Sequence, residues 1–256
     1  MRIDITLASA DRNEKIIVPL HYNKVLQGLI YSQLRNRIPA VHESGWQAKG
    51  RAFRMFVFSR LNGKVERIQE RQIHFLSPIR FSVASPIQSV AEALAEGFLK
   101  ASELRLGSAI LELDKIAVVK SPDLKSGHMR CRAISPVTVY STMLSPEGKK
   151  KTYYYHPAEE EFRMQIEDNL RKKAKALGIP NADNRQIRLE TVQTRTQDQK
   201  VLFYNNIVIK GWMGTFEFTG DPELLALALD AGIGAKNSQG FGMLQKIEKY
   251  NVRPSS

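Results

Sequence analysis

Cysteine and long apolar runs are almost absent from this sequence, and each shortage excludes a class of protein. Cys131 is the one cysteine among 256 residues, so the chain has no pair for an internal disulfide and no Cys/His cluster for structural zinc. We expect Cys131 to be a small buried residue. No apolar run approaches the roughly 18 residues of a membrane span, and the segment MRIDITLAS has no signal-peptide apolar core. These absences predict a cytosolic protein.

Acidic residues are also few: 26 Asp and Glu stand against 38 Lys and Arg, which gives a formal net charge of +12. A basic excess of this size favours a polyanionic partner. The sequence carries no H-E-x-x-H, no clustered carboxylates and no Cys/His quartet, so we expect no metal or other cofactor. Apolar residues are plentiful at 43%, enough for one large domain or for two domains of about 120 residues each.

The first half of the chain alternates strand patterns with helix patterns. Apolar residues recur at helical spacing over 22–37 and 86–101, and alternating or apolar runs between them indicate strands. The expected strands are 2–8, 52–61, 71–84 with an interruption at Pro78, and 104–119. The order β-α-β-β-α-β is that of a ferredoxin-like unit.

The second half repeats this order with an extra early hairpin. Helices are expected over 157–177 and 222–231, the latter with Asp221 as its N-cap. Strands are expected over 129–140, 151–155, 186–195, 201–218 and 241–249. We therefore predict an α+β fold of two tandem ferredoxin-like (RRM-like) domains, residues 1–121 and 122–256, whose antiparallel sheets carry helices on one face. The run Arg171-Lys172-Lys173 predicts a solvated helix face.

The most distinctive segment is 232–242, GIGAKNSQGFG, which holds four of the sixteen glycines. Glycine permits positive φ and close backbone approach, so the run of N–H groups around Lys236 predicts a phosphate cradle. The segment runs from helix to strand, the reverse of a dinucleotide-binding loop, and it lacks the Gly-Lys-Ser/Thr of an NTPase loop. A tight helix C-cap explains Gly232 but not the polar tip. Together with the charge, this segment favours nucleic acid as the partner.

Three passages carry a family resemblance: GIGAKNSQGFGM, IVPLHYNKVLQGLIYSQL and VHESGWQAKGRAFRMFVFS. They resemble the CRISPR-associated endoribonucleases that process precursor repeat RNA, within the repeat-associated mysterious protein superfamily. The first passage is similar to the glycine-rich loop of that family nearly residue for residue. With the tandem order of elements, the resemblance covers essentially the whole chain.

This resemblance implies metal-independent cleavage of precursor CRISPR RNA within its repeats. The ribose 2′-hydroxyl attacks the adjacent phosphorus and leaves a 2′,3′-cyclic phosphate and a 5′-hydroxyl. Such chemistry requires a base for the 2′-OH, an acid for the leaving oxygen and a cation near the phosphorane.

The resemblance assigns the catalytic roles to Tyr31, His42 and Lys49. Tyr31 projects away from the apolar stripe of its helix, onto a basic face. It can donate its phenolic proton, and nearby cations favour a phenolate. His42 is the natural acid or base at neutral pH. His21 is its rival, because it immediately precedes the same helix.

The cation that faces the phosphate is left open among Lys49, Arg51 and Arg54, with Lys49 favoured by the family pattern. RNA contacts are expected from residues in this segment and in the glycine-rich loop. They are Arg51, Gly232, Gly234, Lys236, Asn237, Ser238, Gln239, Gly240 and Gly242.

Two other functions fit the same sequence. The chain can be a non-catalytic RNA-binding subunit of a CRISPR effector complex, which needs no acid/base pair. It can also be a basic protein that binds DNA nonspecifically, with steep salt dependence and no RNA preference. The expected partner is CRISPR repeat RNA, and the sequence leaves open whether other effector subunits or a second copy of the chain also bind.

Overall fold

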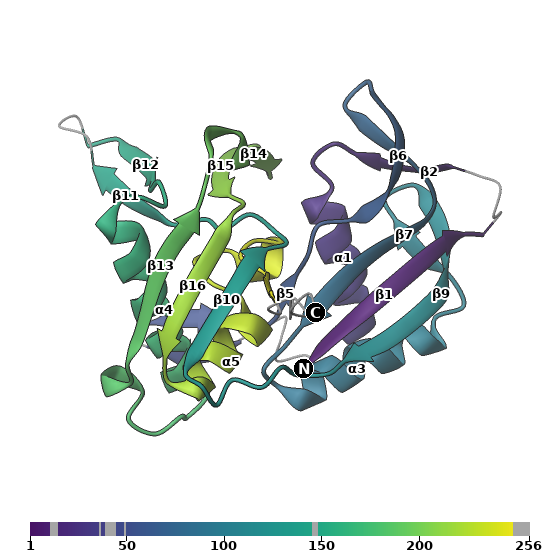
Figure 1. The fold of residues 1–256 in the computed structure, drawn as a ribbon. Helices are drawn as coiled ribbons and strands as arrows, with labels where there is room; N and C mark the ends of the chain where they lie inside the picture. The colour runs from purple at the N-terminus through teal and green to yellow at the C-terminus, as the bar shows by residue number, and fades with distance from the viewer. Residues whose placement is uncertain (11–14, 36, 39–44, 49, 145–147, 248–256) are drawn as a thin grey trace, which may run out of the picture.

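The computed structural model of the chain describes residues 1–10, 15–35, 37–38, 45–48, 50–144 and 148–247. Two antiparallel sheets stand side by side, each with helices packed behind it, as Figure 1 shows. No helix of the described residues is long and apolar enough to cross a membrane. The glycine-rich segment lies where the two halves meet.

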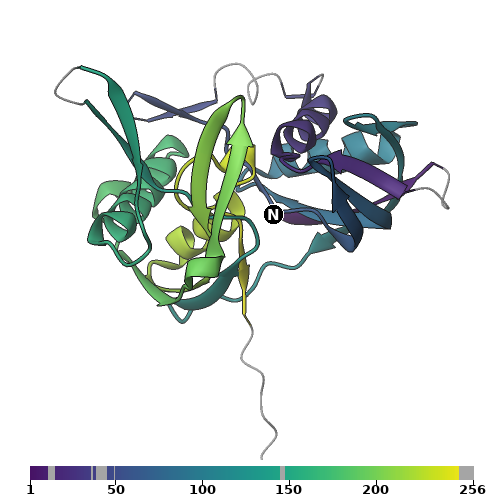
Figure 2. The same cartoon turned by 90° about the horizontal axis from the view of Figure 1, so that it is seen from above.

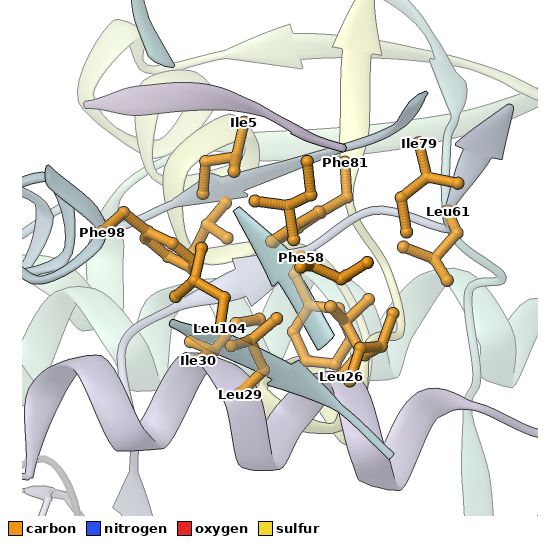
Figure 3. Close-up of a cluster of buried hydrophobic side chains, with 14 of the residues drawn as sticks. Ile5, Leu26, Leu29, Ile30, Phe58, Leu61, Ile79, Phe81, Phe98 and Leu104 are labelled. Atoms are coloured by element: carbon orange, nitrogen blue, oxygen red, sulfur yellow. The ribbon is translucent and has the colours of Figure 1, made fainter. Parts of the chain in front are cut away.

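The N-terminal sheet has the strand order β2-β7-β1-β9-β8, with β5 and β6 also paired to β7. Its strands are β1 (Arg2–Ser9), β2 (Lys15–Pro19), β5 (Val57–Phe58), β6 (Asn62–Gln69), β7 (Gln72–Ala84), β8 (Leu104–Leu106) and β9 (Ala109–Val119). Helices α1 (Asn23–Leu34) and α3 (Gln88–Lys100) cover one face. Alternate residues of β1, such as Ile3 and Ile5, point to that face and are fully buried. Figure 3 shows this core, in which α1 contributes Leu26, Leu29 and Ile30.

The C-terminal sheet has the strand order β13-β16-β10-β17. Its strands are β10 (His128–Ala133), β13 (Ile187–Gln193), β16 (Thr215–Gly220) and β17 (Leu244–Lys246), and its helices are α4 (Glu160–Ala176) and α5 (Pro222–Ala231). Two hairpins project from this half: β11 (Tyr140–Leu144) with β12 (Lys150–Tyr154), and β14 (Gln199–Tyr204) with β15 (Ile207–Trp212). Cys131 on β10 is fully buried, as expected.

A third hairpin, β3 (Trp46–Ala48) with β4 (Arg51–Phe53), crosses from the N-terminal half to the C-terminal half. Figure 2 shows it in blue beside α4. Its residues Ala48 and Phe53 are buried and pack against Ala176 and Leu177 at the end of that helix. This apolar contact holds the segment that follows β4 over the C-terminal half.

The predicted fold class is confirmed. In each half, the four core strands and two helices follow the order β-α-β-β-α-β, and the first strand lies in the middle of the sheet beside the last. Helix α5 has the predicted bounds, and Asp221 caps it by accepting a hydrogen bond from the backbone N–H of Glu223 at 2.9 Å. The two units are therefore tandem ferredoxin-like domains.

Some strand predictions were wrong for local reasons. The expected strand 52–61 is broken, because Met55 has φ of 48° and separates β4 from β5. The expected interruption at Pro78 does not occur, since β7 runs through it. Pro78 lies where β7 exchanges β1 for β2 as its partner, between Ile79 and Leu76, and a missing N–H is tolerated there. Strands β2 and β6 were not predicted.

Two long predicted strands are hairpins instead. The segment 104–119 turns at Gly107, whose φ is 67°, into β8 and β9. The segment 201–218 turns at Asn205 and Asn206, both with positive φ, so β14 and β15 pair before β16 begins. Two adjacent residues with positive φ are the signature of a two-residue hairpin turn.

Candidate functional site

The glycine-rich loop, residues 232–242, is folded tightly on itself. The N–H of Ile233 donates to the carbonyl oxygen of Gly242 at 2.9 Å, and the N–H of Gly242 donates to the carbonyl oxygen of Pro136 at 2.9 Å. A Cβ on Gly242 would lie 1.9 Å from the carbonyl oxygen of Ile233, and one on Gly240 would lie 2.5 Å from the Phe58 ring. The glycines are needed for this packing, and all four are buried. The buried glycines thus shape the loop, and the phosphate cradle of N–H groups around Lys236 stays a prediction.

Lys173 of α4 supports the loop from beneath. Its Nζ donates to the carbonyl oxygens of Gly232 at 2.7 Å and Ala231 at 3.2 Å, and to Oδ1 of Asn237 at 2.8 Å. The side chain is only 2% exposed, so the predicted solvated face was wrong at this residue. Burial lowers the pKa of Lys173 to about 7, whereas three oxygen acceptors favour the ammonium form.

The amide of Asn237 completes this support. Its Nδ2 donates to the carbonyl oxygens of Ile233 and Phe241, both at 2.9 Å. Oδ1 accepts from Lys173, so both ends of the amide are used inside the protein. The amide of Asn237 therefore fixes the shape of the loop, and the expected RNA contact of this residue stays a prediction.

One face of α1 binds the outer side of the loop through residues at spacing i, i+4 and i+8. Asn23 Nδ2 donates to the Gln239 oxygen at 2.9 Å, and Gln27 Nε2 donates to the Ser238 oxygen at 2.6 Å. The Tyr31 side chain is hydrogen-bonded to the Ser238 side chain. Residues four apart lie one above another on a helix. Sequence reasoning identified Tyr31 but missed the other two, although their spacing was visible.

Tyr31 is half-buried at the end of this row. Its ring meets the Phe56 ring edge to face, with centroids 5.4 Å apart. Burial raises the pKa of Tyr31, while the charge of Arg54 and the hydrogen bond with Ser238 lower it by less. The phenol therefore keeps its proton at neutral pH, and the expected phenolate was wrong because burial outweighs the nearby cation.

A cavity of about 190 Å³ opens beside Tyr31, between the β4 segment, α4 and the glycine-rich loop. Its lining includes Arg51 and Arg54 from the N-terminal half. Lys173 and Lys236 contribute from the C-terminal half, and Lys236 Nζ lies 5.2 Å from the centre of the Tyr140 ring. Four cations and no described carboxylate line this space, which favours a negatively charged ligand.

The remaining predicted residues have different outcomes. His42 and Lys49 lie outside the described residues. His21 precedes α1 and packs its ring against Phe203 of β14 at 5.0 Å between centroids. Burial first, and the charge of Arg71 second, lower the pKa of His21. Ser238, Lys236 and Gln239 of the loop are half-exposed.

A second concave surface lies between the two sheets. This groove of about 600 Å³ is lined by residues of β1 and β7 on one side and of β10 on the other. Its arginines are Arg2, Arg60, Arg80 and Arg132, and its one carboxylate is Asp4. The arginines are scattered through the sequence, so no local pattern could have identified them. Within the described part of the chain, no three His, Cys, Asp or Glu side chains gather closely enough to hold a metal ion.

Comparison with known proteins places these features in a family. A family model described as CRISPR-associated protein Cas6, N-terminal, matches residues 17–117. A second model, CRISPR associated protein Cas6, C-terminal, matches residues 119–246. Together the two models span both sheets and the glycine-rich loop.

Individual relatives extend over nearly the whole chain. CRISPR-associated endoribonuclease Cas6 of Pyrococcus furiosus is 28% identical over 97% of this chain and 90% of its own length. CRISPR-associated endoribonuclease Cas6 1 of Methanocaldococcus jannaschii is 25% identical over 99% of this chain and 95% of its own. A solved structure named CRISPR associated protein Cas6 has the same fold, with a TM-score of 0.80 at 23% identity over 97% of this chain and 99% of that one.

Proposed function

The chain belongs to the Cas6 family of CRISPR-associated proteins, and on this basis we propose that it is an endoribonuclease that cleaves precursor CRISPR RNA within its repeats. Relatives named as endoribonucleases match almost the full length of the chain, which supports this activity. The net charge of +12 suits an RNA substrate. The proposal includes the chemistry, the residues and the path of the RNA.

Cleavage proceeds by transfer within the RNA. The 2′-oxygen forms a bond to the adjacent phosphorus as the bond from phosphorus to the 5′-oxygen breaks. A base takes the proton of the 2′-hydroxyl, and an acid gives a proton to the departing 5′-oxygen. The products are a 2′,3′-cyclic phosphate and a 5′-hydroxyl, and no metal takes part.

The observation that carries the proposal is the position of the Tyr31 phenol. It is protonated, fixed by Phe56 and Ser238, and next to a cavity lined by four cations. A fixed phenol with its proton can donate to an oxygen that gains negative charge in the transition state. We assign Tyr31 to the leaving 5′-oxygen or to a non-bridging oxygen of the phosphorane.

The other roles follow the family pattern. We assign His42 to general acid/base catalysis and Lys49 to stabilisation of the phosphorane. Arg51 and Lys236 bind phosphates on either side, because both line the cavity beside Tyr31. The arginine-lined groove between the sheets then gives the rest of the RNA a positively charged path.

A cleavage assay in EDTA tests this function. Labelled CRISPR repeat RNA is incubated with the protein, beside a copy with a 2′-deoxy sugar at the scissile position. We expect the first RNA to be cut, with a 2′,3′-cyclic phosphate at the new end, and the second to survive. Cleavage that requires an added divalent metal contradicts the mechanism.

Two further results separate the parts of the proposal. Tight binding of repeat RNA without any cut identifies the chain as a non-catalytic RNA-binding subunit instead. A His42→Ala variant that retains the full rate removes His42 from the mechanism but leaves the activity in place. Equal affinity for repeat RNA and unrelated duplex DNA contradicts both readings.

A further inference from the structure

The cavity beside Tyr31 contains more than positive charge. Its floor is one turn of α4, where Asn169 and Lys173 lie four residues apart on the same side of the helix. Its roof is the segment from Arg51 to Phe56, and one wall is the glycine-rich loop. The cavity has a volume of about 190 Å³, whereas one water needs about 10–15 Å³ on the same measure. It is therefore larger than a site for a single small ion requires.

Two polar groups at this cavity are buried without a hydrogen-bond partner among the described residues. They are Oδ1 of Asn169, whose side chain is 7% exposed, and Nη1 of Arg54. Buried polar groups in native proteins are nearly always paired, so an unpaired one requires an explanation. One of these groups is an acceptor and the other is a donor. Both line the cavity, and they come from different halves of the protein.

Aromatic residues add a third element to the lining. Phe53 and Phe56 in the roof are buried by packing, at 9% and 1% exposed, so the aromatic surface open to a base is the partly exposed ring of Tyr140, which stands beside Lys236 at the start of β11. Proteins that recognise single-stranded RNA stack unpaired bases on aromatic side chains and read their edges with hydrogen bonds. A site of this composition offers stacking surface, a donor and an acceptor together.

We propose that this cavity binds the base of one unpaired nucleotide of the RNA, next to the phosphodiester that is cut. The Asn169 amide and the Arg54 guanidinium read the edge of the base, while Lys236 binds its phosphate. This inference rests on the proposed function, because it concerns the same RNA. It adds a specificity determinant to the catalytic residues.

A phosphate alone explains the cavity less well. The Lys173 ammonium already has three acceptors, so it has no proton left for a ligand. The Asn169 oxygen is an acceptor and would repel a phosphate oxygen, whereas it can accept from the amino group of a base. The mixture of donor and acceptor therefore favours a base over a second phosphate.

A position scan on uncut RNA tests the inference. Repeat RNA with a 2′-deoxy sugar at the scissile position is prepared with one abasic site at a time on either side of it. The Kd of each RNA is measured for the wild type and for Asn169→Leu at one fixed salt concentration. In the wild type, we expect one abasic position beside the scissile bond to weaken binding about 10- to 100-fold. In Asn169→Leu, the same abasic position should weaken binding at least about threefold less than in the wild type, because one contact with the base is already lost.

Control variants separate a lost contact from a damaged fold. Leu fills the place of an unpaired polar group, so Asn169→Leu should unfold at the same denaturant concentration as the wild type or a higher one. Arg54→Gln should also reduce the penalty at the same position. Arg105→Gln removes an equal charge from an exposed site on β8, paired with Glu103, and should leave the scan unchanged.

The outcomes distinguish this inference from the proposed function. If no position is sensitive, or if Asn169→Leu keeps the same penalties as the wild type, the cavity does not read a base. Cleavage by the wild type can still be intact in that case. If one position is sensitive but the natural repeat is never cut, the cavity reads a base in a protein that only binds RNA. A protein that binds no repeat RNA contradicts both.

Discussion

Lys173 contacts the glycine-rich loop from α4, whereas Lys236 is part of the loop, and the two lysines differ in burial and in their contacts. Lys173 is 2% exposed, and its ammonium donates to three oxygens of the loop and the end of α5. Lys236 is half-exposed, has left-handed backbone geometry and lies over the Tyr140 ring. The first lysine builds the loop, and the second remains accessible to a ligand. The same residue type thus supports the loop at position 173 and stays accessible at position 236 for the RNA contact that we propose.

The same division separates residues along α1. Asn23 and Gln27 donate hydrogen bonds to backbone oxygens of the loop and thereby hold it against α1. Tyr31, one turn further on, contacts Phe56 and the Ser238 side chain, and both of these residues line the cation-lined cavity. Mutations that separate structural effects from catalytic effects therefore test this division directly.

The largest effect is expected from Tyr31→Phe, which removes only the phenol oxygen. We expect the single-turnover cleavage rate to fall about 10²- to 10⁴-fold, the usual contribution of a proton donor in the transition state. RNA affinity should change little, because the ring and its contact with Phe56 remain.

Tyr204→Phe is the matched control for this variant. The Tyr204 hydroxyl donates to Oε1 of Gln27, so this change also removes one phenol oxygen near the loop. We expect it to slow cleavage far less than Tyr31→Phe does. Equal losses in the two variants would mean that Tyr31 acts through the structure of the loop and not on the RNA.

The next effect is on stability, where Lys173→Met tests the support of the loop. Three oxygens lose their donor, so we expect the free energy of unfolding at pH 7 to fall by about 2–3 kcal/mol. Lys172→Met is the control. Lys172 is the half-exposed neighbour of Lys173 and is paired with Asp168 on the same helix. That change should cost less than about 1 kcal/mol. Urea unfolding of both variants checks the comparison, and equal losses would contradict it.

The contrast between Lys172 and Lys173 also shows why part of the structure could not be predicted from the sequence. Neighbouring lysines on a helix give the same local pattern, and only the packing of α4 against the glycine-rich loop separates them. The sheets show the same limit. Periodicity identified the order of elements, because it is local, whereas pairing with distant strands decided that β7 continues through Pro78.

The site follows the same rule. Tyr31 and the loop could be identified, because a family pattern marks both. Gln27 shares the helical spacing of Tyr31, but its role depends on a contact with Ser238, which lies 211 residues away. The arginines of the groove between the sheets share no motif, and the fold alone brings them together. Contacts between the two halves therefore account for most of what the sequence did not predict.

A smaller effect is expected in the pH dependence of stability. The pKa of Lys173 is about 7 in the folded protein and near 10.5 when unfolded. Between these values the unfolded chain binds one more proton, so the free energy of unfolding rises with pH. We expect this slope to be steeper in the wild type than in Lys173→Met, by up to about 1.4 kcal/mol per pH unit between pH 7 and 10. If the free energy of unfolding has the same pH dependence in the wild type and in Lys173→Met, Lys173 keeps its ammonium form throughout this range.

The smallest effect concerns the Tyr31 phenol itself. The charge of Arg54 lowers the pKa of Tyr31 against the larger effect of burial, so Arg54→Gln should raise that pKa further. NMR titration of ¹³C-labelled tyrosine measures it, with Tyr31→Phe to assign the resonance. Arg51→Gln is the matched control, because Arg51 lines the same cavity but is exposed at the start of β4. If Arg51→Gln raises the pKa of Tyr31 more than Arg54→Gln does, Arg51 is the cation that acts on the phenol. If only Arg54→Gln raises it, Arg54 is the cation that faces the reacting group.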